Sequence, residues 1–175
     1  MATVSTGRSV ATLDRMDAEA FVSAVGPLFE DAPAYLSLLA AARPFGTWTS
    51  LFRVAEDIAL AAPYEVQVAL LAAHPRIGAP PMTVSSLSFR EQGYDQEQQD
   101  AIAALGPLND RYEARFGFRY VIFVAGRPRS TIAMLLEQAI DGDRDTERRR
   151  GLRDVVAIAR ARAVGLGMLE EDVTG

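Results

Sequence analysis

The sequence has no cysteine and a single histidine among its 175 residues. The lack of cysteine excludes disulfides, thiolate nucleophiles and cysteine-based zinc sites, and a single histidine excludes metal sites that need two imidazoles. No apolar run is long enough to cross a bilayer, and the first residues lack the apolar core of a signal peptide. These absences predict a cytoplasmic protein that binds no metal and has no membrane partner.

A positive charge excess is also missing, since the formal net charge is -5. Proteins gain affinity for nucleic acids largely by neutralising phosphates, so we expect no nucleic-acid partner. The one basic cluster is the run from Arg148 to Arg150. We interpret it as a solvated helix face paired with Asp145 and Glu147 rather than as a phosphate site.

The composition is that of an ordinary globular protein, with 49% hydrophobic and 23% charged residues. Alanine, leucine, glutamate and arginine dominate, which favours helix throughout, and the length suits one domain. We predict an all-α fold, a single compact multi-helix domain over residues 13–168. A flexible N-terminal tail at residues 1–12 and a C-terminal tail at residues 169–175 would flank it.

Caps and prolines indicate where the helices begin and end. Asp17 is placed to cap one helix, Pro33 suits the first turn of the next, and Pro75 must end a third. A further helix is expected to run from Ser88 to Leu105. The pair Gly106-Pro107 is expected to break it and to begin another short helix.

One stretch differs from this helical pattern. FRYVIFVAG, at residues 118–126, is rich in β-branched and aromatic residues, as strands are. No second strand candidate is available to pair with it, so we interpret it as a buried extended segment. Two helices, near residues 130–140 and 146–166, are expected to close the chain.

The lone histidine, His74, stands at the end of an apolar helical run, directly before Pro75. On an apolar stripe a histidine is more often a core residue than a catalyst. Its place at a helix end, beside a proline-rich loop, favours instead a side chain that borders a cleft. Because its pKa is near neutral, it is the natural proton donor or acceptor there.

Two other patterns admit both a structural and a functional interpretation. Ser88 and Glu91 match a capping box, and the N-terminus of such a helix also binds anions. Arg162 falls within the apolar face of the last helix, where a buried guanidinium needs a partner. That partner is either an internal carboxylate or a substrate carboxylate, which arginine can bind through two nitrogens.

Five segments in order resemble the 2-oxo-4-hydroxy-4-carboxy-5-ureidoimidazoline (OHCU) decarboxylases: FEDAPAYLSLLAAARPF, LLAAHPRIG, SFREQ, LNDRYEARFGFRYVIFVAG and IARARAVGL. The combination of HP-x-[LI], S-x-x-E-Q and L-N-x-x-Y-x-x-x-F-G-F is specific, and the resemblance covers about residues 13–168. It implies an all-α carboxy-lyase that needs no cofactor. Such an enzyme releases CO2 from a small-molecule substrate, OHCU, to leave (S)-allantoin in urate degradation. A homodimer would suit a small helical enzyme.

The resemblance also implies roles for single residues. His74 would be the catalytic imidazole, held by Glu91, and would deliver the proton that fixes the stereochemistry. The substrate would be contacted by Pro75, Ser88, Phe89, Arg90, Gln92, Tyr120, Val121, Ile122, Phe123, Val124 and Arg162. The extended segment would offer its unpaired backbone groups to the ureido and ring heteroatoms.

Two positions depart from the family pattern. Ala139-Ile140 stands where Arg-Leu is usual, and Arg119 in FGFRY replaces a proline beside the predicted binding segment. An additional cation at the pocket edge could change the accepted substrate. One alternative is therefore the same scaffold acting on a different ureido or imidazoline acid. Another alternative is a non-catalytic helical interaction module.

Overall fold

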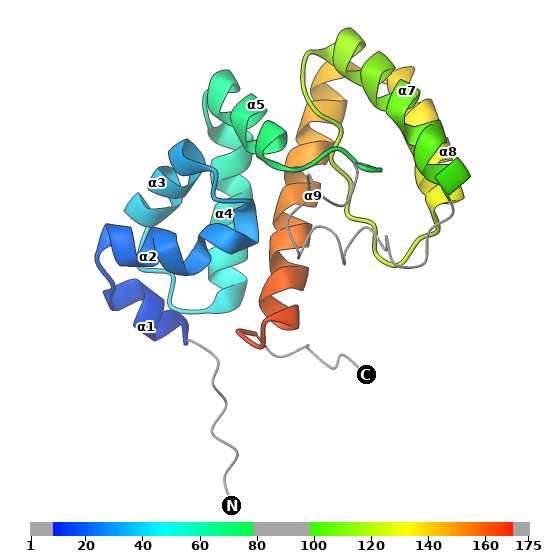
Figure 1. Cartoon of the computed structure of the whole chain (residues 1–175). Helices are drawn as coiled ribbons and strands as arrows, with labels where there is room; N and C mark the ends of the chain where they lie inside the picture. The colour runs from blue at the N-terminus through cyan, green and yellow to red at the C-terminus, as the bar shows by residue number, and fades with distance from the viewer. Residues whose placement is uncertain (1–8, 79–98, 170–175) are drawn as a thin grey trace, which may run out of the picture.

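Helices make up most of the described part of the chain, which covers residues 9–78 and 99–169 of the computed structural model (Figure 1). They are α1 (Val10–Arg15), α2 (Ala18–Val25), the 3₁₀ helix η1 (Gly26–Phe29), α3 (Pro33–Ala41), α4 (Trp48–Ala61), α5 (Tyr64–Ala73), α7 (Gln99–Phe116), α8 (Arg129–Ile140) and α9 (Arg144–Gly165). These two ranges contain no β-strand, and none of their helices is long and apolar enough to span a membrane. The predicted all-α fold is confirmed.

Short polar side chains begin several of these helices. Asp17, Thr47 and Asp143 each accept a hydrogen bond from the backbone amide three residues further on, which satisfies one of the free amides of a first turn. Ser9 caps α1 in the same way, so this helix begins inside the stretch 1–12 that we expected to be a tail.

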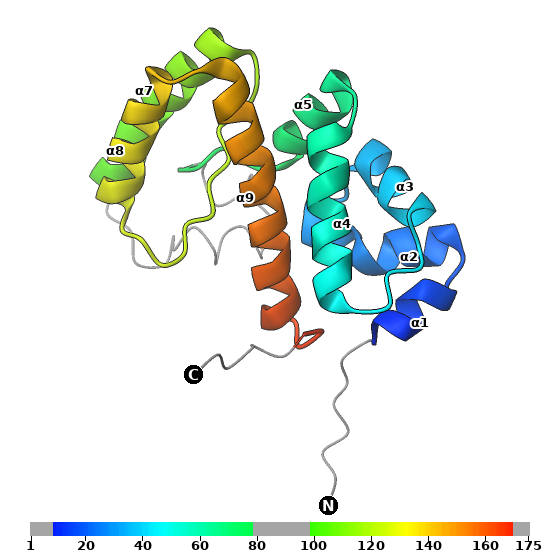
Figure 2. The same cartoon turned by 180° about the vertical axis from the view of Figure 1, so that it is seen from behind.

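Helix α9 lies between two groups of helices (Figures 1 and 2). Helices α1 to α5 gather on one side of it, where α9 packs against α4, α5 and η1. Helices α7 and α8 pack against each other on the other side. The buried face of α9 includes Leu152, Val155, Ile158 and Ala159. Side chains of α9 can therefore reach both the end of α5 and the segment that joins α7 to α8.

Aromatic rings join the extended segment to α7. The ring centroid of Tyr112 lies 4.7 Å from that of Phe116, 5.8 Å from that of Phe118 and 5.0 Å from that of Tyr120, all with edge-on geometry. Offset and edge-on pairs of this kind are favourable beyond the area they bury. This cluster fixes the beginning of the extended segment in the core.

The predicted helix break at Gly106-Pro107 is wrong. Helix α7 continues through Pro107 to Phe116, although proline removes one backbone hydrogen bond at a cost of about 3 kcal/mol. The turn is held from outside, because Leu105 is fully buried and the Asn109 amide donates to the carbonyls of Leu105 and Ile77, each at 2.9 Å. Tertiary contacts therefore outweigh the local preference. The predicted start at Ser88 lies outside the described residues.

The stretch after α7 is irregular, as predicted, but only its first residues are buried and it ends in an exposed turn. Residues 119–124 form neither helix nor strand, and Tyr120 and Val121 are buried. A turn at residues 125–126 then leads to α8, which begins at Arg129. The segment runs beside α9, as the hydrogen bonds described below show.

Candidate active site

His74 is the residue at which α5 ends. Proline disfavours helical geometry in the residue before it, and His74 accordingly has extended backbone angles of φ -78° and ψ 139°. Its Nδ1 lies 3.1 Å from the carbonyl oxygen of Leu70. A carbonyl can only accept, so Nδ1 carries the proton of the neutral ring and Nε2 has the lone pair.

The imidazole is buried, with 3% of the residue exposed, and Nε2 has no hydrogen-bond partner among the described residues. A buried polar atom without a partner is costly unless it serves a ligand or a reaction. The orientation of His74 therefore leaves one basic nitrogen available to a bound molecule. The half-buried Pro75 follows it directly.

Burial is the main reason that the pKa of His74 falls from 6.5 to about 4, and the positive charge of Arg162 lowers it further. Arg119 acts in the same direction, more weakly. The Leu70 carbonyl and the negative charge of Glu30 act against these effects. At neutral pH the ring is therefore uncharged and able to accept a proton through Nε2.

Arg162 is held in the core by the turn that follows α2. Its Nη1 donates to the carbonyl oxygens of Pro27 at 3.1 Å and Leu28 at 3.2 Å, and its Nη2 forms an ion pair with Glu30 at 2.7 Å. Only 1% of the Arg162 side chain is exposed. The predicted burial of Arg162 is confirmed, and of the two partners considered the structure provides the internal carboxylate, that of Glu30. Binding of a substrate carboxylate by Arg162 stays a prediction.

Glu30 is a site residue that the sequence reasoning missed. It has φ +50° and is followed by Asp31 at φ +55°, two consecutive left-handed residues that are not glycine. Such strain is often found at functional sites, where surrounding contacts hold it in place. Here the turn directs the Glu30 carboxylate towards Arg162. The available signal was the demand of a buried arginine for an acidic partner.

Arg119 connects the extended segment to the end of α5. Its Nη1 donates to the carbonyl oxygens of Ala72 at 2.9 Å and of His74 at 2.8 Å. Arg119 was expected to be an additional cation at the pocket edge. The structure shows that the guanidinium also binds the backbone beside the histidine, while its effect on substrate choice stays a prediction.

The extended segment is held by α9. Arg150 Nη1 donates to the Val121 carbonyl at 2.9 Å. The Phe123 amide donates to the Asp154 carboxylate. Burial raises the pKa of Asp154, and this hydrogen bond acts against the rise. The predicted reason for the unpaired segment, that a ligand takes up its backbone groups, is therefore incomplete. Side chains of α9 satisfy some of them. Among the described residues, the Ile122 backbone has no hydrogen-bond partner.

Three predicted parts of the site are thus brought together: His74, Arg162 and the extended segment. Arg162 lies close enough to His74 for its charge to lower the pKa of the imidazole. Arg119 joins His74 to the segment that contains Tyr120 to Val124. The remaining predicted site residues lie outside the described residues: Ser88, Phe89, Arg90, Glu91 and Gln92. No cluster of three or more possible metal ligands is found in the described ranges.

The sequence is similar to those of known proteins. A sequence model of the OHCU decarboxylase family matches residues 14–164. The chain is 33% identical to the "uric acid degradation bifunctional protein PucL" of Bacillus subtilis (strain 168), over 86% of this chain and 31% of that protein. It is 30% identical to the 2-oxo-4-hydroxy-4-carboxy-5-ureidoimidazoline decarboxylase of Haloferax volcanii, over 86% of this chain and 90% of that protein.

Solved structures share the fold. The crystal structure of an OHCU decarboxylase in the presence of (S)-allantoin superposes with a TM-score of 0.64 at 20% identity, over 78% of this chain and 92% of that chain. The crystal structure of an (S)-allantoin synthase gives a TM-score of 0.66 at 18% identity, over 90% of this chain and 54% of that chain. The chain spans about a third of the length of the Bacillus subtilis protein and most of the Haloferax volcanii protein.

Proposed function

The chain belongs to the OHCU decarboxylase family, and from this premise we propose that it converts OHCU to (S)-allantoin and CO2 in urate degradation. The observation that carries the proposal is the buried, neutral His74, whose Nε2 has no partner among the described residues, in the field of the buried Arg162. A carboxylic acid substrate needs both a positive charge and a proton carrier, and these two residues supply them.

The reaction needs no electrophilic cofactor. When the bond to the carboxylate breaks, its electron pair passes into the adjacent imine, whose nitrogen takes a proton from water. The resulting enol then loses its hydroxyl proton to become a carbonyl, while the neighbouring ring carbon gains a proton. A single neutral imidazole can accept the hydroxyl proton at Nε2 and return it to one face of that carbon. Delivery to one face gives a single enantiomer.

Arg162 suits the role of a fixed charge. Its terminal nitrogens already bind the turn around η1, so the guanidinium is oriented before any substrate arrives. A charge that does not have to reorganise is effective in a site that excludes water. We propose that Arg162 attracts the substrate carboxylate and stabilises the charge that develops as CO2 leaves.

The remaining predicted contacts belong to the same proposal. Glu91 would hold His74, and Ser88, Phe89, Arg90 and Gln92 would contact the substrate, together with Pro75 and the segment from Tyr120 to Val124. The unpartnered backbone of Ile122, within the described ranges, supports a role for this segment. Cytoplasmic location and a homodimer stay predictions from the sequence.

The test is to measure allantoin formation and its optical activity, with OHCU generated in place from urate by urate oxidase and hydroxyisourate hydrolase. We expect rapid formation of optically active (S)-allantoin by the wild type and its loss in His74→Ala. Arg53→Ala, which changes an exposed surface arginine, is the control and should behave as the wild type. Racemic product at the spontaneous rate from all three proteins would overturn the proposal and favour a different ureido acid.

A further inference from the structure

His74 satisfies two of the last carbonyls of α5, that of Leu71 through its backbone amide and that of Leu70 through Nδ1, but the carbonyls beyond them lack the usual partners. No basic residue lies in its last turn, no glycine follows it, and Pro75 has no amide hydrogen to donate. Carbonyl groups at a helix C-terminus need hydrogen-bond partners and attract positive charge. Arg119 supplies both from a distant part of the chain, through its bonds to the carbonyls of Ala72 and His74.

We propose that Arg119 is a positioning residue for His74, which holds the backbone of the histidine in place and thereby sets the position of its reactive nitrogen. The inference rests on the proposed function in that it assigns catalysis to His74. The residue is then fixed at two points, its own carbonyl by Arg119 and its ring Nδ1 by the Leu70 carbonyl. Nε2 is left with little freedom to move.

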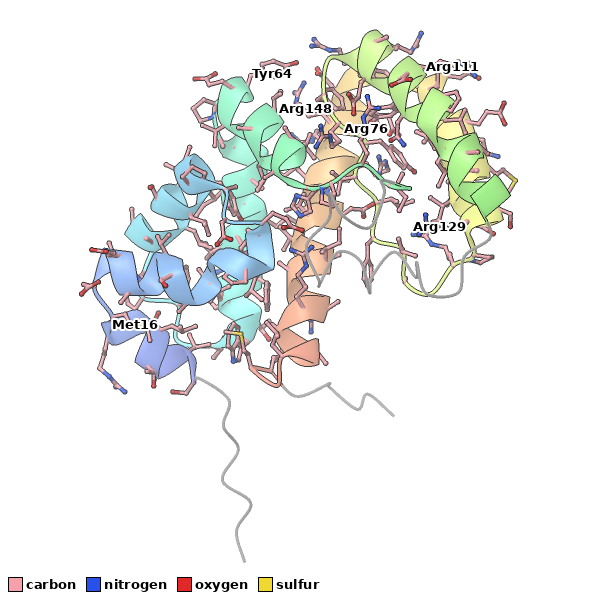
Figure 3. All side chains as sticks on the ribbon, viewed as in Figure 1. Met16, Tyr64, Arg76, Arg111, Arg129 and Arg148 are labelled. Atoms are coloured by element: carbon pink, nitrogen blue, oxygen red, sulfur yellow. The ribbon has the colours of Figure 1, made fainter. Side chains whose placement is uncertain are left out.

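Arg119 also lies beside an acidic residue of α7, in an ion pair without a hydrogen bond. Its Nε lies 3.5 Å from Glu113 Oε1, and Glu113 also accepts two hydrogen bonds from Arg76, at 2.9 Å and 2.8 Å. Arg76, labelled in Figure 3, also binds Asp110 at 2.8 Å. Helix α7 thus binds the chain after Pro75 through Arg76. It also places the negative charge of Glu113 beside Arg119, which binds the backbone on both sides of Ala73.

The charge of Arg119 also acts on the imidazole. Among the described residues, the charged groups that influence the pKa of His74 are Arg162 on α9, Glu30 at the end of η1, and Arg119 at the start of the extended segment. Arg162 and Arg119 lower the pKa and Glu30 raises it. Removal of Arg119 should therefore raise the pKa of His74, both by the lost charge and by greater access of water to a loosened residue.

The protein offers a direct readout, since His74 is its only histidine. The imidazole resonances in an NMR titration of the full chain therefore report on this residue without assignment. We expect Arg119→Met to raise the titration midpoint by about half a pH unit or more. Arg119→Lys keeps the charge and a hydrogen-bond donor, so its titration midpoint should lie close to that of the wild type. It is also the variant to measure if Arg119→Met does not fold.

Arg144→Met is the matched control. Arg144 donates from Nε to the carbonyl of Phe116 at 2.9 Å, so it also binds the C-terminal end of a helix, α7, but it is not among the charges that shift His74. We expect it to lower the melting temperature as Arg119→Met does and to leave the His74 midpoint unchanged. An unchanged midpoint in Arg119→Met, or an equal shift in Arg144→Met, would overturn the inference.

Turnover gives a second, separate measurement. With OHCU as substrate, Arg119→Met should lower kcat about 10-fold and change KM little, because a displaced imidazole affects the proton transfer more than binding. If the wild type does not turn over OHCU, the proposed function fails while the titration still tests the role of Arg119. If Arg119→Met has wild-type kcat, the positioning role is overturned.

Discussion

The carboxylate of Glu30 lies 2.7 Å from Nη2 of Arg162, and the two side chains are 14% and 1% exposed. They come from opposite ends of the chain, one after η1 and one near the end of α9. The pair holds Arg162 beside the turn that supplies two further carbonyl acceptors. Breaking an ion pair that is shielded from water is costly, because the remaining charge loses its compensation.

Glu30→Gln should therefore lower both stability and activity. Glutamine keeps a hydrogen-bond acceptor and removes the charge opposite the buried guanidinium, so we expect a loss of about 2–4 kcal/mol of unfolding free energy in urea. The His74 midpoint should fall, since Glu30 normally raises its pKa. Glu19→Gln, at an exposed position on α2, is the control. Equal stability of the two variants would contradict the structural role of Glu30.

The stability of the protein should decrease as the pH falls from about 6.5 to about 4. The unfolded chain binds a proton at His74 near pH 6.5, whereas the folded protein binds it only near pH 4. The contribution of neutral His74 to the free energy of unfolding is thus fully present above pH 6.5. It is lost as the pH falls to about 4, by on the order of 3 kcal/mol in all. Urea unfolding of wild type and His74→Gln at several pH values separates it from carboxylate effects. If the difference in unfolding free energy between the two proteins stays constant with pH, the predicted contribution of His74 is refuted.

Arg150→Met should destabilise the attachment of the extended segment. Arg150 donates to the Val121 carbonyl and binds the carboxylates of Asp154 and the buried Glu147. We expect a loss of about 3 kcal/mol in urea unfolding, because Glu147 is left buried without this counter-charge. Arg53→Met, whose ion pair with Asp57 is long and exposed, should unfold at the wild-type urea concentration. If Arg150→Met also unfolds at the wild-type urea concentration, Arg150 does not stabilise the attachment of the extended segment.

Gly78→Ala should be more damaging than Gly46→Ala. Both glycines have positive φ, +81° and +77°, which disfavours any residue with a Cβ. At Gly78 the new Cβ would also lie 2.9 Å from Leu105 Cβ, whereas at Gly46 no atom lies within 4 Å. We expect an additional loss of about 1–3 kcal/mol for Gly78→Ala from the forced displacement of Leu105. Equal melting temperatures of the two variants would contradict this.

Local features of the sequence were sufficient to predict several parts of the structure. The cap at Asp17, the helix end at His74 and the burial of Arg162 follow from short patterns of hydrophobic, polar and proline residues. The continuous helix through Pro107 was not predictable in this way, because contacts of Leu105 and Asn109 with distant residues outweigh the local effect of proline.

The candidate site shows the same division. His74 and Arg162 could be identified because a lone histidine before a proline and an arginine on an apolar face are unusual. Glu30 could not be identified, and Arg119 stood out only as a departure from the family pattern. Their roles depend on bonds across the fold, to Arg162 and to the His74 carbonyl. A single sequence does not reveal which carboxylate meets which guanidinium.

Helix α9 contacts the extended segment through Arg150 and the η1 turn through Arg162. Between these two residues the helix rises by about 18 Å and turns by about 100° for each residue. A single insertion or deletion between positions 150 and 162 would therefore rotate one arginine away from its partners while the other stayed bound. Substitutions at the exposed positions of this interval should be tolerated, whereas a change of its length should not.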